Sequence, residues 1–136
     1  MRFIIISKVF LFLLALSLSV ISTDLNVSFA DDSLDGKTFI IELSENDKNN
    51  KTKDELIFKD GTFFSSDCEQ YGFGSAPYET KPKGDTILFE STLTSEKEGK
   101  SEWEGKIEGD QITGTFIWSK EGQKPMIYTY QGSIKK

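Results

Sequence analysis

Two runs of alternating residues, joined by a two-residue turn, constrain the fold of this chain more than any other feature. Polar and apolar residues alternate before Gly109-Asp110 and alternate again after it. Pairing across that turn places Trp103 opposite Phe116, and all apolar residues of the hairpin except Ile117 share their face. Because a slip of one residue would turn that face toward solvent, the pattern predicts an antiparallel hairpin with this register.

The rest of the chain after residue 36 repeats this β-type pattern. A second hairpin is expected at Asp60-Gly61, because a type I′ turn needs a positive φ at both central residues; it places Phe58 opposite Phe63. No window shows a sustained helical period. The expected strands are residues 37–43, 56–59, 62–64, 78–81, 86–93, 102–108, 111–118 and 124–134. The polar stretches 44–53 and 94–100 are interpreted as exposed loops, and residues 65–77 as an irregular segment.

The expected fold is all-β: an antiparallel up-and-down meander of seven or eight strands forming a closed or partly closed barrel. Each strand has one apolar and one polar face, as in a sheet with one side in water. A twisted sheet of this size tends to curl, and closure removes its exposed edges. Glycines on the inward face, at Gly105, Gly114 and Gly132, permit the bends that closure requires. A β-sandwich is the alternative.

The N-terminal region predicts export. Arg2 and Lys8 precede an apolar run of 13 residues, which suits a signal peptide and is short for a membrane span of about 20 residues. Small residues around Ala30 predict cleavage after it. We therefore expect a signal peptide at residues 1–30, a single domain at residues 31–136, and a secreted or periplasmic location. The alternative is an uncleaved membrane anchor; after cleavage no stable membrane insertion is expected.

Charge and missing residue types exclude several functions. Once Arg2, Lys8 and Asp24 are removed, 14 basic and 21 acidic residues remain, with no arginine, so a nucleic-acid partner is not expected. The chain has no histidine, which removes Ser-His-Asp and Cys-His catalysis and histidine-based metal sites. We expect no cofactor, no metal site and no enzyme activity, although a carboxylate-only acid–base pair stays open as the less favoured, histidine-free enzyme.

The glycine and aromatic spacing resembles that of a known class of barrel. The motif Trp103-x-Gly105-x-Ile107-x-Gly109-Asp110-x-Ile112-x-Gly114-Thr115, with Leu34-x-Gly36-x-x-Phe39 before it and Tyr130-x-Gly132 after it, is similar to small secreted lipocalin-like (calycin-type) β-barrel domains. Many of these are uncharacterised bacterial proteins. The resemblance covers most of residues 34–136 and implies a barrel that takes an apolar ligand.

Two sets of residues are candidates for function. The first would line a pocket for a small apolar or aromatic ligand, with the small pair Gly105 and Gly114 leaving space beside Trp103: Trp103, Gly105, Gly114, Phe116, Trp118, Tyr128 and Tyr130. The second would form a protein-interaction loop over a solid core, its partner unidentified: Cys68, Tyr71, Phe73 and Tyr78. The lone cysteine is either a buried small hydrophobe or a free thiol that pairs with a partner.

Overall fold

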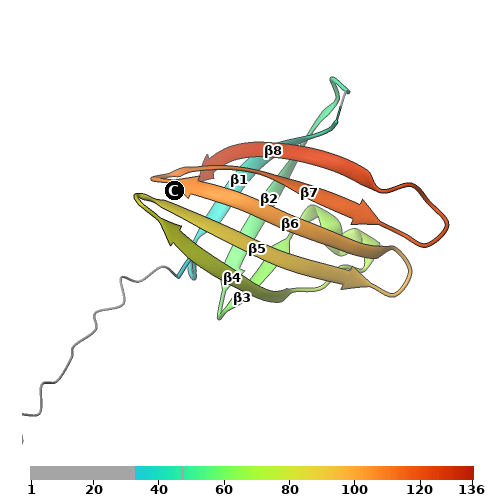
Figure 1. The fold of residues 1–136 in the computed structure, drawn as a ribbon, viewed down its shortest axis with the longest axis horizontal. Helices are drawn as coiled ribbons and strands as arrows, with labels where there is room; N and C mark the ends of the chain where they lie inside the picture. Colours follow the sequence, from blue (N-terminus) through green and yellow to red (C-terminus); the bar gives the residue numbers. More distant parts are fainter. Residues whose placement is uncertain (1–32, 47) are drawn as a thin grey trace, which may run out of the picture.

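The computed structural model describes residues 33–46 and 48–136 as an all-β fold with one short 3₁₀ helix (Figure 1). The elements are β1 (Thr38–Glu45), β2 (Lys51–Lys59), β3 (Thr62–Ser65), η1 (Asp67–Tyr71), β4 (Ala76–Lys83), β5 (Thr86–Ser95), β6 (Gly99–Glu108), β7 (Gln111–Ser119) and β8 (Met126–Ile134). The predicted signal peptide and its cleavage site after Ala30 lie outside the described residues.

The eight strands form a closed antiparallel barrel in chain order. Each strand pairs with the next one, and β8 returns to pair with β1 from Phe39 opposite Ile134 to Glu45 opposite Tyr128. This confirms the predicted meander and its closure, and it rules out the β-sandwich. The narrowest seam lies between β3 and β4, where only Thr62 and Phe63 pair across to β4.

Both predicted hairpin registers are confirmed. In β6 and β7, Trp103 pairs with Phe116 and Gly105 with Gly114. In β2 and β3, Phe58 pairs with Phe63 and Ile57 with Phe64. The intervening Asp60 and Gly61 have φ values of 52° and 75°, both positive as a type I′ turn requires.

Several of the expected element boundaries are wrong. The stretch 44–53 is not one exposed loop, because β1 and β2 continue pairing through it as far as Ser44 opposite Lys51. This part of the hairpin lies mostly in water, so pairing there leaves no apolar alternation in the sequence. Strand β4 is longer than residues 78–81, and the 94–100 loop is shorter than expected, since Ser95 pairs with Gly99. The irregular segment 65–77 contains η1.

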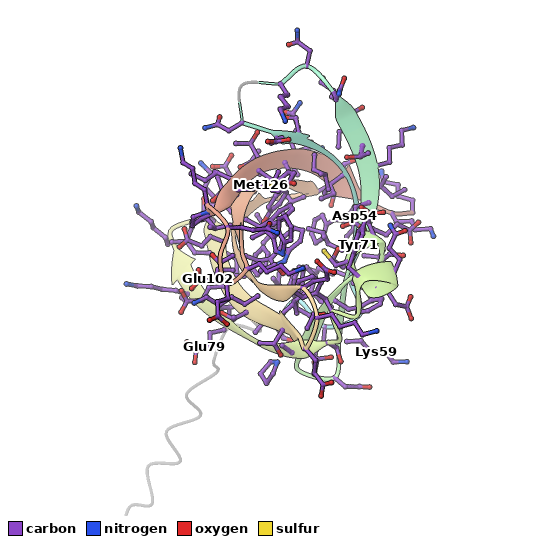
Figure 2. All side chains as sticks on the ribbon, turned by 90° about the vertical axis from the view of Figure 1, so that its right-hand side faces the viewer. Asp54, Lys59, Tyr71, Glu79, Glu102 and Met126 are labelled. Atoms are coloured by element: carbon purple, nitrogen blue, oxygen red, sulfur yellow. The ribbon has the colours of Figure 1, made fainter. Side chains whose placement is uncertain are left out.

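The two ends of the barrel are different. At one end the short turns gather, and residues 33–37 fold across the opening with the Leu34 side chain fully buried. At the other end, on the right in Figure 1, η1 and the loops between β5 and β6 and between β7 and β8 surround the opening. Figure 2 looks into this open end: aromatic side chains fill the interior, and Tyr71 and Met126 are labelled around the rim.

Candidate functional site

The space expected beside Trp103 is occupied by other side chains. Trp103 is only 1% exposed. A Cβ atom at Gly105 would overlap the Phe89 ring and the Tyr130 hydroxyl, and one at Gly114 would overlap Tyr130 as well. The glycine pair therefore makes room for two aromatic side chains of the core, and leaves no pocket for a ligand at this depth.

Tyr130 explains why glycines stand at both positions. Its hydroxyl crosses the Gly105–Gly114 pair and donates a hydrogen bond to the carbonyl oxygen of Glu104 at 2.6 Å. Burial raises the pKa of the Tyr130 hydroxyl well above its ordinary value. At this site Tyr130 is a neutral donor within the core.

A stack of three rings leads from this core to the open end. The Trp103 and Phe116 rings are stacked with centroids 4.2 Å apart, and Phe116 and Tyr128 are stacked at 4.4 Å with an angle of 6° between their planes. Trp103 and Phe116 are buried, whereas Tyr128 is half-buried. The outer part of the stack thus presents aromatic surface where the barrel opens.

A cavity of about 350 Å³ lies at this open end. It is lined by Leu43, Thr52, Asp54, Asp67, Cys68, Tyr71, Phe73, Glu98, Ser101, Phe116, Trp118 and Tyr128. The cavity brings together members of both predicted sets: Phe116, Trp118 and Tyr128 from the pocket candidates, and Cys68, Tyr71 and Phe73 from the loop candidates. Trp103, Gly105, Gly114 and Tyr130 do not line it, because they lie deeper or against the barrel wall.

Trp118 is held in place at the cavity by the neighbouring hairpin. Its indole N–H donates to the carbonyl oxygen of Glu98 at 2.6 Å. The Glu98 carboxylate in turn pairs with Lys120 at 3.2 Å. These contacts join the loop between β5 and β6 to the end of β7, so the indole ring is positioned before any ligand arrives.

Asp54 is a cavity residue that the sequence analysis missed. It is 5% exposed and accepts hydrogen bonds from the Ser65 hydroxyl at 2.5 Å and from the backbone N–H groups of Asp67 at 2.8 Å and Glu55 at 2.7 Å. Burial raises the pKa of its carboxyl group, and these hydrogen bonds oppose that rise. The signal was its spacing: Asp54 lies two residues before Leu56 and four before Phe58, and so shares their inward face. It was missed because the expected strand began only at Leu56.

Cys68 lies half-buried in η1, at the cavity wall. Burial raises the pKa of its thiol to about 11, and the carboxylates of Asp54 and Asp67 act in the same direction. The thiol is therefore protonated near neutral pH, and a protonated thiol is a poor nucleophile. This environment favours the interpretation of Cys68 as a packing residue over that of a reactive partner-binding thiol.

The other loop candidates do not form one surface. Tyr71 is 54% exposed at the rim, but Phe73 is buried in the core. Tyr78 belongs to β4 at the opposite end, where its hydroxyl donates to the Asp35 carboxylate at 2.7 Å. The expectation that these aromatics project together from the 65–77 segment is wrong, because Phe73 turns inward and Tyr78 closes the other end.

No metal or membrane-spanning feature is found in the part of the chain that the structure describes. There, no three histidine, cysteine or acidic side chains are grouped so that they could hold a metal ion. Within the same residues, no helix has the length and apolar character needed to cross a bilayer.

The class of protein that fold and cavity define is a small eight-stranded antiparallel barrel with one closed and one open end. Comparisons with protein-family models, with curated proteins and with solved structures find no match to this chain. The cavity at the open end is therefore the feature of this chain that bears on its function.

Proposed function

We propose that this protein is a non-enzymatic binding domain that holds a small apolar or aromatic molecule in the cavity at the open end of the barrel. The observation that carries the proposal is the aromatic lining, in which Phe116, Trp118 and Tyr128 face the same space. Ligand pockets in proteins are concave and mostly apolar, with a few polar groups that orient the ligand. This cavity has that composition.

The size of the cavity limits the ligand. Its 350 Å³ lies near the lower end of the range of about 300–1,000 Å³ for small-molecule sites. The cavity does not continue into the closed end of the barrel. There, the ring centroids of Phe58, Phe63 and Phe89 lie 5.0 to 5.3 Å apart. A ligand of one or two rings matches this volume better than a long acyl chain.

The titratable groups at the cavity support binding over catalysis. The thiol of Cys68 is protonated near neutral pH, and the Asp54 carboxyl group already accepts three hydrogen bonds from the protein. Neither is positioned beside a histidine base, since the chain has none. Export and membership of the lipocalin-like class belong to this proposal too; they rest on the N-terminal pattern and on the glycine and aromatic spacing.

Titration with N-phenyl-1-naphthylamine, a neutral fluorescent aromatic probe, tests the proposal. We expect saturable binding to the purified protein. Thr52 is an exposed residue at the cavity edge, so Thr52→Trp should block the opening and weaken binding about tenfold or more, or ~1.4 kcal/mol. Lys53→Trp is the matched control, because its side chain is on the outer face of the same strand and should leave binding unchanged.

Absence of saturable probe binding to the wild-type protein, or equal binding by the Thr52→Trp and Lys53→Trp variants, would place any binding site elsewhere. Circular dichroism of both variants checks that the barrel is intact in each case.

A further inference from the structure

The cavity is acidic on one side. Asp54 on β2 and Asp67 on η1 both line it, and neither forms an ion pair with a lysine among the described residues. Glu98 also lines it and is paired with Lys120. None of the described lining residues is a lysine. The cavity therefore contains more negative charge than its own surroundings neutralise.

The two unpaired carboxylates lie close enough for the charge of Asp67 to act on Asp54. Burial raises the pKa of Asp54, and the negative charge of Asp67 adds to the rise; burial also raises the pKa of the Cys68 thiol, with both carboxylates acting in the same direction. The effect of Asp67 on Asp54 is a repulsion between like charges in a partly buried wall, where charges are poorly screened. A positive charge placed in the cavity would relieve it.

The other side of the cavity is aromatic. Phe116, Trp118 and Tyr128 contribute from β7 and β8, whereas Tyr71, the last residue of η1, lies on the same side as the carboxylates. In Figure 2, Asp54 and Tyr71 are labelled near one another on one side of the opening. The faces of aromatic rings attract cations, and a tryptophan ring does so most strongly. Because Trp103 and Tyr128 stack on Phe116, Trp118 and Tyr128 are the rings that can offer a face to a cation. Together with the unpaired carboxylates, these two rings form an environment suited to an organic cation.

We propose that the ligand of this cavity is an organic ammonium ion carried on a small apolar or aromatic body. This inference rests on the proposed function and adds the charge of the ligand to it. The ammonium group lies between the Asp54–Asp67 wall and the aromatic rings, and the apolar body contacts Leu43 and Phe73. An anionic ligand of the same shape is repelled by the carboxylates, and a neutral one leaves them uncompensated.

Three ligands of similar shape and different charge test the inference in the wild-type protein. They are phenethyltrimethylammonium, its neutral carbon analogue (3,3-dimethylbutyl)benzene, and 4-phenylbutanoate, each titrated as a competitor of N-phenyl-1-naphthylamine. We expect the cation to bind at least about tenfold more tightly than the neutral analogue. The anion should bind more weakly than either.

Two variants locate the effect. Asp67→Asn keeps an oxygen acceptor for Gln70 and removes one charge, so it should weaken cation binding several-fold and leave the neutral analogue unchanged. Asp110→Asn makes the same substitution in the turn at the closed end and should change neither. Trp118→Leu should lower the ratio of cation to neutral affinity, because it removes the largest ring of the cavity.

The outcomes separate this inference from the proposed function. Probe binding with no preference for the cation, or with a preference for the anion, overturns the ammonium ligand and leaves the binding domain standing. Failure of the probe to bind overturns both. An Asp110→Asn variant that weakens cation binding as much as Asp67→Asn would show a general effect of the acidic surface, which also contradicts the inference.

Discussion

At the scale of single residues, the clearest relation is between one tyrosine and two glycines. The alternation around Gly109-Asp110 correctly predicted that Gly105 and Gly114 pair and point inward. It did not show what fills the space above them, because Tyr130 lies on β8, one strand beyond the hairpin. Periodicity in the sequence indicates on which face of the sheet a residue lies. Whether space remains beside that residue depends on the side chains of other strands, here on the long side chain of Tyr130.

Adding one methyl group at Gly105 should disturb the core. Gly105→Ala should lower the free energy of unfolding by about 2 kcal/mol, because its Cβ meets the rings of Phe89 and Tyr130 in a packed interior. Gly74→Ala is the control: it has open space around it and no positive φ, so it should change stability by less than about 0.5 kcal/mol. Urea unfolding of both variants measures this, and equal stabilities would show that the core accommodates the methyl group.

At the scale of elements, the N-terminal segment and the β2–β3 turn close one end of the barrel together. The Asp35 carboxylate accepts hydrogen bonds from the Tyr78 hydroxyl and from the Gly61 backbone N–H, at 3.0 Å to one oxygen and 3.1 Å to the other. The N–H of Gly36 donates to the carbonyl oxygen of Phe58 at 2.8 Å. These contacts hold Leu34 as a plug. No local sequence pattern indicated this role, because Gly36 bonds to Phe58, 22 residues away, and Leu34 to Tyr78, 44 residues away.

The closure at Asp35 should depend on pH. Hydrogen bonds from Tyr78, and then from Gly61, lower the pKa of Asp35 below its ordinary value of 3.8. A carboxyl group with a lowered folded-state pKa stabilises the fold above the unfolded-state pKa, and that stabilisation is lost as the pH falls through the folded-state value. Between pH 5 and about 2, the wild-type protein should therefore lose more stability than Asp35→Asn. Unfolding midpoints measured across this range check it, and parallel curves for the two proteins would contradict it.

At the scale of the whole molecule, the barrel combines a solid closed end with a cavity at the open end. The all-β meander, its closure and two hairpin registers could be predicted, because turn chemistry and alternation are local properties of the chain. The position of the cavity could not, since it depends on where η1 lies against β2, through the Asp67 N–H donating to Asp54. Members of the pocket set and of the loop set are far apart in the sequence, and they meet at the cavity only when the barrel has formed.

The central claim is that ligand enters at the open end and nowhere else, and an amide-resolved NMR titration tests it most directly. Adding N-phenyl-1-naphthylamine to the ¹⁵N-labelled protein should shift the backbone amide signals of Leu43, Cys68 and Phe73 and the indole signal of Trp118. The amide signals of Gly61 and Gly109, in turns at the closed end, should stay in place. Shifts centred on those two turns, or no shifts at saturating probe, would contradict the account.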